Sequence, residues 1–313
     1  CIRDRPLDFL QNREPKLRAD DLTPVEWEAD PELEWCPPGH GDIYTALLAS
    51  GLLDALLEQG YRYAMTANSD NLGAAPSARI AGWFAASGAP YAPEMCRRTP
   101  ADVKGGHLAV RKSDGRIILR DTAQTPDDQM HYFTDQFRHP FFHTNNLWFD
   151  LKVLRDTLVE RGGILGLPLI KNSKTVDPAD SSSTPVVQLE TAMGAAVEAF
   201  EGATAIEVPR SRFLPVKTTN DLLLVRSDVY ELDDDGLLQM VPEQACTVNL
   251  DPRFYKKIQD FEARFPEGVP SIKDARSLTV DGDWTFGSGV VATGEAHVGQ
   301  EGSPGRIADG VHI

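Results

Sequence analysis

The sequence of 313 residues predicts an α/β protein with a mainly parallel sheet, followed by a C-terminal β-helix. Two observations lead to this fold class. Helical and strand-like patterns alternate from residue 42 to about residue 234, which is typical of a parallel sheet covered by helices. From Leu278, apolar residues recur every six positions between scattered glycines, a period typical of a β-helix. We therefore expect an α/β domain over residues 1–234 and a second region over 235–313, with the β-helix starting near residue 278.

The spacing of apolar residues sets the order of elements in the α/β region. Residues 42–59 carry an apolar stripe that stops at Gly60, as in an amphipathic helix. The turn Ser113-Asp114-Gly115 joins two strand-like runs and predicts a hairpin. Residues 139–146 read as a loop, and 177–185 have the composition of a linker. The predicted order is helix 42–59, strand 61–67, helix 74–87, strands 106–111 and 116–121, helix 147–161, strand 164–170, helix 188–201, strand 205–208 and helix 219–234.

Two interleaved series of apolar residues define the C-terminal repeat. One series is Leu278, Trp284, Val290 and Ala296, and the other is Val280, Phe286, Ala292 and Val298. Two ordinary hairpins are the alternative explanation. Four repeats in two registers favour the β-helix, whose coils stack short strands.

Composition and charge place the chain among soluble globular proteins that do not bind nucleic acid or membranes. Hydrophobic residues make up 41% and charged residues 25% of the chain. The net charge of -16 argues against nucleic acid and anionic membranes as partners, because both attract Lys and Arg. No apolar run has the length of a membrane span. The four cysteines are widely spaced without a CxxC pair, which argues against a disulfide framework and against a zinc site. We therefore expect the protein in the reducing cytoplasm.

Two polar segments are placed where ligands bind in α/β proteins. The run Pro37–Asp42 precedes the first predicted helix, and its glycines let the backbone approach a phosphate or a carbonyl group. The run Asn68–Asn71 ends the strand 61–67, and Asp70 within it is suited to hold Mg²⁺ against a phosphate. Taken singly, each segment has a plainer explanation. The first is a helix cap with Asp42 as the N-cap, and the second is an Asx turn.

Together with later motifs, these segments resemble the UTP–glucose-1-phosphate uridylyltransferase (UDP-glucose pyrophosphorylase) family. The matching runs are PPGHGDIY, SGLLD, NSDNLGA, DVKGGHL, HTNNLW, QLETAMGAA and VPRSRFLPVKTTNDLLLVRSD, in that order. The resemblance covers the chain from about Phe9 to the C-terminal repeats. It implies a Rossmann-like nucleotidyltransferase domain with a mainly parallel mixed sheet and a C-terminal left-handed β-helix. The PPGHGD loop points to the glucose branch of these enzymes.

The resemblance also implies a role for particular residues. Asp70 would bind the metal, and Lys217 would neutralise phosphate charge, so these two form the expected catalytic pair. Gly39 and His40 would bind the nucleotide. The expected sugar ligands are Asn68, Gly105, Gly106, Asp121 and Asn145. Some of them also have a plainer explanation. Lys217 is equally consistent with an ordinary surface lysine, and Asn145 with a residue that hydrogen-bonds backbone groups of its loop.

The implied reaction is the reversible transfer of a uridylyl group from UTP to glucose 1-phosphate, giving UDP-glucose and pyrophosphate. The sugar phosphate attacks the α-phosphorus in line, and Mg²⁺ is the expected cofactor. A phosphate monoester is already largely dianionic at neutral pH, so the attack needs no general base. Charge neutralisation and positioning supply the catalysis. The C-terminal β-helix is the expected surface of self-association.

One family feature has no copy in this sequence. The glycine-rich loop that wraps the triphosphate in the family lies upstream of all the quoted motifs, and the first residue here is Cys1 rather than Met. We therefore expect the 1–234 domain to lack its N-terminal section in this chain. If the given residues were the whole protein, we would expect little or no catalytic activity, whereas the intact protein is expected to be an enzyme.

Smaller departures bear on sugar specificity. His107 stands where the family usually has threonine, and Asp121 where it usually has glutamate. Two alternatives to a glucose-specific enzyme remain open, the second of them because the triphosphate loop has no copy in this sequence. One is a UDP-sugar pyrophosphorylase of broad specificity, which turnover of galactose 1-phosphate would reveal. The other is a non-catalytic scaffold that binds a UDP-sugar without pyrophosphate exchange.

Overall fold

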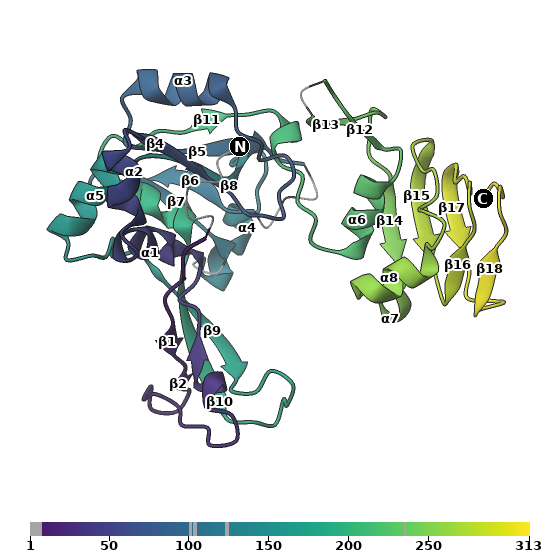
Figure 1. Ribbon diagram of the computed structural model, residues 1–313, viewed down its shortest axis with the longest axis horizontal. Helices are drawn as coiled ribbons and strands as arrows, with labels where there is room; N and C mark the ends of the chain where they lie inside the picture. The colour runs from purple at the N-terminus through teal and green to yellow at the C-terminus, as the bar shows by residue number, and fades with distance from the viewer. Residues whose placement is uncertain (1–7, 100–101, 103–104, 123–124, 235) are drawn as a thin grey trace. The chain divides into compact units, whose positions relative to one another are not determined.

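The computed structural model describes residues 8–99, 102, 105–122, 125–234 and 236–313 (Figure 1). The chain forms two compact units. Unit 1 comprises the described parts of Cys1–Ala67 and Pro76–Pro209, and unit 2 comprises Asn68–Ala75 and the described part of Arg210–Ile313. This division follows Pro209, whereas the sequence suggested a boundary after residue 234. It also groups the Asn68–Ala75 loop with unit 2.

A four-stranded sheet with the order β11-β5-β8-β4 forms the centre of unit 1 (Figure 1). Its strands are β4 (Tyr63–Thr66), β5 (Tyr91–Arg97), β8 (Phe141–Asp150) and β11 (Ile206–Glu207). Only β11 and β5 pair in parallel, because β8 runs antiparallel to both β5 and β4. The prediction of a mainly parallel sheet was therefore wrong for this sheet, although the mixed α/β class is confirmed.

The error arises from β8, which the sequence suggested was a loop followed by the start of a helix. The side chains of Thr144 and Asn146 are polar but buried, since they bind partners on β5. The polar run therefore continues the sheet. The helix expected at 147–161 is α5 (Leu151–Glu160), and Asp150 caps it by accepting hydrogen bonds from the backbone N–H groups of Lys152 and Val153 at 2.9 and 3.2 Å.

The other helices of unit 1 follow the sequence pattern more closely. The helix expected at 42–59 is a 3₁₀ turn, η2 (His40–Asp42), followed by α1 (Ile43–Ala49) and α2 (Leu52–Glu58). Gly51 separates α1 from α2 with a φ of 73°, which glycine adopts without steric cost. The next helix, α3 (Ala78–Ser87), begins at the N-cap Ser77 and ends at Gly88. The expected hairpin is confirmed as β6 (His107–Val110) paired antiparallel with β7 (Ile117–Arg120).

A second sheet of unit 1 replaces two predicted elements. It has the order β2-β10-β9 and contains β2 (Leu17–Arg18), β9 (Leu169–Thr175) and β10 (Pro185–Thr191). The strand expected at 164–170 begins only at Leu169. The helix expected at 188–201 is wrong, because its first residues pair with β9 and the rest form the 3₁₀ helix η6 (Met193–Ala199). The linker-like stretch 177–185 is the loop that joins β9 to β10.

The core of unit 1 lies between α1, α2, α5, η6 and the central sheet. Its buried members include Tyr44, Leu53, Phe149 and Leu154. The hydroxyl groups of Tyr44 and Tyr91 both donate to the carbonyl of Met193, at 2.8 and 3.0 Å, so they tie η6 to this core. Further elements in the described residues of unit 1 are β1 (Glu14–Pro15), η1 (Pro31–Glu34), β3 (Trp35–Cys36), η5 (Asp127–Gln129) and α4 (Met130–Phe133).

Unit 2 begins after its first loop with η7 (Arg210–Arg212) and α6 (Thr219–Arg226). A capping box between Thr218 and Asp221 starts α6. The helix expected at 219–234 ends early, because the chain turns into the hairpin of β12 (Tyr230–Leu232) and β13 (Leu238–Met240). The short helices α7 (Pro252–Tyr255) and α8 (Ile258–Arg264) follow β14 (Thr247–Leu250).

The C-terminal part of unit 2 stacks its strands in parallel (Figure 1). One row is β14, β15 (Ala275–Val280) and β17 (Gly294–Val298), and a second is β16 (Trp284–Phe286) and β18 (Gly305–Ile307). Parallel bridges join Ser271 to Val291 and Val291 to His312 in a third row.

The six-residue period marks the interior of these stacked coils. Every residue of the two apolar series is buried except Trp284, which is partly buried. The alternative of two ordinary hairpins is therefore wrong. The hand of the coil, and with it the left-handed β-helix, stays a prediction.

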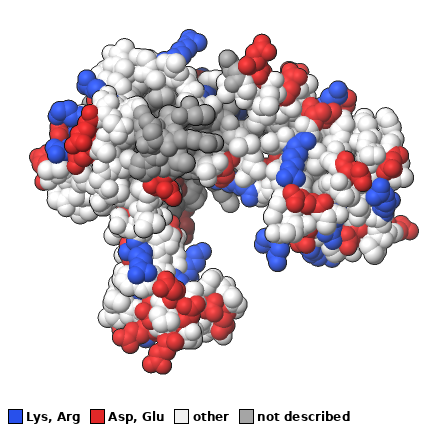
Figure 2. Space-filling view, viewed as in Figure 1, with Lys and Arg blue, Asp and Glu red and all other residues white. Residues whose placement is uncertain are grey.

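None of the helices in the described residues has both the length and the apolar run that crossing a membrane requires. Figure 2 shows acidic side chains gathered over the end of the β2-β10-β9 sheet. The basic side chains visible on this face lie at several separate places. This distribution agrees with the net charge of -16.

Candidate active site

The loop Pro37–Asp42 packs tightly against the end of β10. A Cβ atom on Gly39 would lie 2.5 Å from the carbonyl oxygen of Thr191, and one on Gly41 would lie 2.5 Å from the Thr191 hydroxyl. The backbone N–H of Thr191 donates to the carbonyl of Pro38 at 2.9 Å. Gly39 also has a φ of 82°. Glycine is therefore required at positions 39 and 41 for the loop to take this path.

One hydrogen bond from the backbone fixes the ring of His40 and its tautomer. Its Nδ1 atom accepts from the backbone N–H of Met193 at 2.9 Å, so the proton of the neutral ring is on Nε2. Burial lowers the pKa of His40, and the negative charges of Glu190 and Asp121 oppose this effect. The ring is therefore neutral at neutral pH, and Nε2–H is available to a ligand oxygen.

Gln11 and Asn12 both contact this loop, and the sequence patterns predicted neither contact. The Asp42 carboxylate makes no hydrogen bond to the first turn of α1, because it accepts from the backbone N–H and the side chain of Asn12, both at 2.8 Å. Asp42 is therefore the N-cap residue of α1, as the plainer explanation had it, but its side chain does not cap the helix. Gln11 donates to the Gly39 carbonyl at 2.8 Å, and sequence spacing gave no sign of this contact.

The predicted sugar ligands of unit 1 gather where the β6–β7 hairpin meets β8. A Cβ atom on Gly106 would lie 3.2 Å from the Asp121 carboxylate, and one on Gly105 would lie 3.1 Å from Phe142. The backbone N–H of His143 donates to the carbonyl of Gly106 at 2.7 Å. The backbone N–H of Asn145 in turn donates to Nδ1 of His143 at 3.1 Å. The hairpin and β8 are thus joined at this point.

His143 connects this group to the nucleotide loop, and the sequence did not single it out. The residue is partly buried, and its Nε2 atom is buried without a hydrogen-bond partner in the described part of the chain. Burial first, and then the nearby His40, lower the pKa of His143 to about 4. His40 therefore lies within electrostatic reach of both Asp121 and His143. The structure brings the nucleotide and sugar candidates of unit 1 into one neighbourhood.

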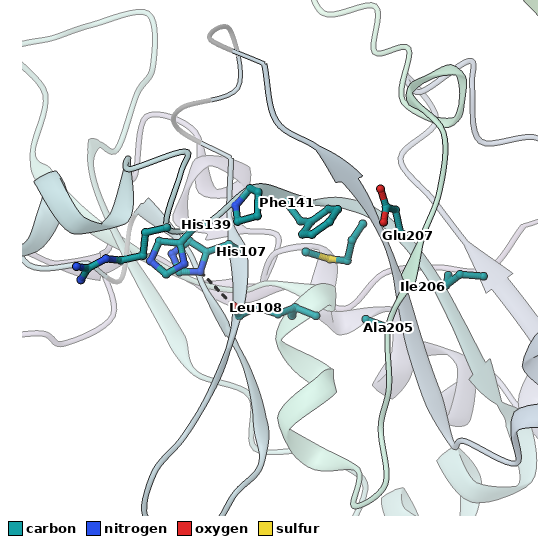
Figure 3. Close-up of a pocket in the computed structure, with 10 residues that line it drawn as sticks. His107, Leu108, His139, Phe141, Ala205, Ile206 and Glu207 are labelled. Carbon is teal, nitrogen blue, oxygen red and sulfur yellow. Dashed lines mark hydrogen bonds between the residues drawn. The ribbon is translucent and has the colours of Figure 1, made fainter.

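A cavity of about 370 Å³ lies beside this neighbourhood (Figure 3). Figure 3 shows the rings of His107 and His139 face to face at one side and Glu207 of β11 at the other. The two ring centroids are 3.8 Å apart, and burial lowers the pKa of His107 to about 4. None of the predicted site residues is among the described residues that line this cavity. We assign it no part in the predicted chemistry.

The remaining predicted residues, Asn68, Asp70 and Lys217, belong to unit 2. The backbone N–H of Val216 donates to the Asp70 carbonyl at 2.8 Å, which places Lys217 one residue beyond an Asp70 contact. Asn71 fastens the two segments, because its side chain donates to the Arg212 carbonyl at 3.1 Å and accepts from the Leu214 N–H at 2.7 Å. Lys217 itself is exposed.

The side chain of Asp70 fits a cation that phosphate oxygens also bind. Its Oδ1 atom is buried and has no hydrogen-bond partner in the described residues. No group of three or more His, Cys, Asp or Glu side chains suited to a metal occurs in the described ranges. A single carboxylate is nevertheless enough for Mg²⁺, which keeps waters and substrate phosphates as its other ligands. The residues present therefore fit Mg²⁺ better than a metal held by protein groups alone.

Comparison with known proteins settles the family. A family model described as UTP–glucose-1-phosphate uridylyltransferase matches residues 3–292. The chain belongs to the UTP–glucose-1-phosphate uridylyltransferase family. The uridylyltransferase of Solanum tuberosum is 41% identical over 97% of this chain and 63% of its own length. That of Saccharomyces cerevisiae is 41% identical over 93% of this chain and 58% of its own length.

Solved structures of UDP-glucose pyrophosphorylases share the fold. The Leishmania major protein superposes with a TM-score of 0.87 at 44% identity, covering 99% of this chain and 68% of that chain. A variant of it in complex with UDP-glucose has a TM-score of 0.85 at 45% identity, covering 96% and 66%. The chain spans less than two thirds of the length of the curated uridylyltransferases named above.

Burial of His143 makes the stability of this uridylyltransferase family member fall in mild acid. Its folded pKa of about 4 lies below the ordinary value of 6.5, so the unfolded state binds more protons between these values. The contribution is complete above about pH 6.5 and is lost as the pH falls towards 4, at about 1 kcal/mol per pH unit. Urea unfolding at pH 7.0, 6.0 and 5.0 measures this slope.

The matched variant for that measurement is His143→Asn, whose side-chain oxygen replaces Nδ1 as the acceptor for the Asn145 N–H. We expect a shallower loss of unfolding free energy with falling pH in the variant. Equal slopes in the two proteins would contradict the assignment of this titration to His143.

Proposed function

We propose that the protein transfers the uridylyl group of UTP to glucose 1-phosphate, reversibly giving UDP-glucose and pyrophosphate. The observation that carries the proposal is the glycine-containing loop Pro37–Asp42, which places a neutral His40 near Asp121 and His143, in a chain of the uridylyltransferase family. The UDP-glucose complex of the Leishmania major relative, at 45% identity, supports the choice of ligand.

The residues of unit 1 bind the nucleotide and the sugar in this proposal. Gly39 lets the loop backbone approach the uridine, and the Nε2–H of His40 donates to an oxygen of the α-phosphate. Gly105 and Gly106 let the backbone pass close to the hexose. Asp121 accepts hydrogen bonds from sugar hydroxyl groups, and Asn145 both donates and accepts them.

The residues of unit 2 serve the phosphates. Asp70 holds Mg²⁺, which would supply neutralising charge to the phosphate oxygens. Lys217 also neutralises phosphate charge. Its exposed ammonium group is carried on a flexible side chain, which can adjust to the phosphate oxygens during the reaction. Asn68 binds the phosphate or a hydroxyl group of the sugar phosphate.

The chemistry is one displacement at phosphorus. An oxygen of glucose 1-phosphate forms a bond to the α-phosphorus of UTP, and the bond from that phosphorus to the α–β bridging oxygen breaks. Pyrophosphate leaves with the electron pair. No proton needs to be removed from the nucleophile, so the site requires no His–carboxylate pair. One phosphoanhydride replaces another, which makes the step reversible.

Further features complete the proposal. The C-terminal coils are left-handed and provide a surface for self-association, and the protein works in the reducing cytoplasm. The parallel rows of β14, β15 and β17 and of β16 and β18 support the coil. The wide spacing of the cysteines supports the compartment.

Substrate-dependent pyrophosphate release tests the function. We expect release from UTP with Mg²⁺ only when glucose 1-phosphate is present, and little release with galactose 1-phosphate. Comparable rates with both sugars would instead support a UDP-sugar pyrophosphorylase of broad specificity. Absence of release, with UDP-glucose still raising the melting temperature, would overturn the enzyme in favour of a binding scaffold.

A further inference from the structure

Glu94 is a wholly buried acidic residue in the middle of β5, with no exposed surface. Burying a carboxyl group is costly unless hydrogen bonds compensate it. One carboxyl oxygen of Glu94 accepts from the side-chain amide of Asn146 at 3.0 Å, and the other accepts from the indole N–H of Trp148 at 2.9 Å. Both of these partners come from β8. Glu94 therefore ties one specific stretch of β8 to β5.

That stretch is a bulge in the sheet. The pairing of β5 with β8 passes from Pro93 opposite Leu147 to Met95 opposite His143. Glu94 alone thus faces the three residues from Thr144 to Asn146. Such a bulge bends one strand and redirects a side chain, and bulges are frequent beside active sites.

The middle residue of the bulge, Asn145, has a backbone conformation that few side chains adopt. Its φ is 65°, and Leu22 is the only other non-glycine residue with a positive φ among the described residues. Asparagine tolerates this left-handed region better than most residues, but the surrounding structure must still hold it there. Asn145 is also one of the predicted sugar ligands.

Glu94 binds the residues on both sides of Asn145. The Thr144 hydroxyl donates to the backbone carbonyl of Glu94 at 2.8 Å, and the Asn146 amide donates to its carboxyl group. The backbone N–H of Asn146 supports the same arrangement, because it donates to the Thr144 hydroxyl at 3.2 Å. Glu94 therefore fixes both neighbours of Asn145, Thr144 through its backbone carbonyl and Asn146 through its carboxyl group. These two contacts hold Asn145 at its positive φ.

We propose that Glu94 is a positioning residue that holds Asn145 in the orientation needed to bind the hexose, and so contributes to sugar selectivity. The proposal rests on the uridylyl transfer proposed above. Glu94 acts through Asn145 and does not touch the substrate. A purely structural buried acid would change stability without changing sugar binding selectively.

The variant Glu94→Gln tests this role with little change in volume. Its amide nitrogen must face either Asn146 or Trp148, which are both donors, so one hydrogen bond is lost and two donors oppose each other. We expect the KM for glucose 1-phosphate to rise about 10-fold while the KM for UTP and kcat change less than about 3-fold. The preference for glucose 1-phosphate over galactose 1-phosphate should also fall. An unchanged KM for glucose 1-phosphate would overturn the proposal.

A double-mutant cycle separates positioning from general damage. In an Asn145→Ala background, Glu94→Gln should raise the KM for glucose 1-phosphate no further, because the residue it positions is gone. Independent, multiplicative effects of the two substitutions would contradict the coupling. If Glu94→Gln does not fold, Thr144→Val removes one hydrogen bond of the same bulge, and we expect the same selective rise in KM.

Asp150→Asn is the matched control. Like Glu94 on β5, Asp150 at the end of β8 is a buried carboxylate. Its partners are different, because it binds the start of α5 and Arg62. We expect a lower melting temperature without a change in the KM for glucose 1-phosphate. If the parent protein shows no turnover, the proposed function fails, and calorimetric titration with UDP-glucose makes the same comparison among the variants. Equal affinities of the parent and Glu94→Gln would then overturn the role of Glu94.

Discussion

Asp70→Ala is expected to lower kcat by about 10²–10³-fold, the loss typical of removing one preorganised electrostatic group. The Asp70 backbone is fixed by the Val216 N–H, so the carboxylate position is set by the fold. Its Oδ1 atom is buried and makes no hydrogen bond in the described structure, and Ala at this position breaks no contact of that atom. We therefore expect a large kinetic effect with a melting temperature close to that of the parent protein.

Pyrophosphate release over a range of Mg²⁺ concentrations measures this effect. The Mg²⁺ concentration that gives the half-maximal rate should rise in Asp70→Ala, which a general defect would not produce. Glu243→Ala, an exposed acidic residue of unit 2 outside the proposed site, should leave both values unchanged. Parent-like turnover of Asp70→Ala would remove Asp70 from the mechanism.

Lys217→Ala is expected to reduce kcat/KM by about 10²-fold, because the charge that offsets two polyanionic substrates is lost. The side chain is exposed, so its removal leaves no cavity in the core. Its backbone N–H donates to the Asp221 carboxylate at 3.0 Å, and Ala keeps that bond and the capping box of α6. The melting temperature should therefore stay within about 2 °C of the parent value.

The control for Lys217 is Lys273→Ala, which removes an exposed lysine of the same unit. Initial rates at subsaturating UTP and glucose 1-phosphate should be unchanged in this control. Lys217→Arg should recover part of the lost rate, since the charge remains and its geometry changes. A Lys217→Ala rate equal to that of Lys273→Ala would reduce Lys217 to an ordinary surface residue.

The C-terminal coils were the part of the fold that sequence patterns predicted best. Their apolar period repeats with the coil, so the spacing of Leu278 and Phe286 was enough to assign both residues to the interior. The stretch at 188–201 failed for the opposite reason. Its apolar spacing fits a helix, but residues 188–191 pair with β9, and this long-range pairing decides their conformation.

Strand β8 shows why polar residues misled the prediction of the sheet. Thr144 and Asn146 would be unfavourable in an ordinary buried strand, and hydrogen bonds to Glu94, 50 and 52 residues earlier, help to make their burial acceptable. A single sequence gives no sign of such a pairing. The same limit explains why Gln11 and His143 were missed. The loop Pro37–Asp42 and the run Asn68–Asn71 were singled out from local residues, but only the family resemblance gave them a role.

The fate of an isotopic label in glucose 1-phosphate tests the central claim most directly. The phosphate oxygens of glucose 1-phosphate are labelled with ¹⁸O, the substrate is incubated with UTP, Mg²⁺ and the protein, and both products are analysed by mass spectrometry. Attack by the sugar phosphate on the α-phosphorus predicts that all label is in UDP-glucose and none is in pyrophosphate. Label in pyrophosphate, or no labelled UDP-glucose at all, would contradict the account.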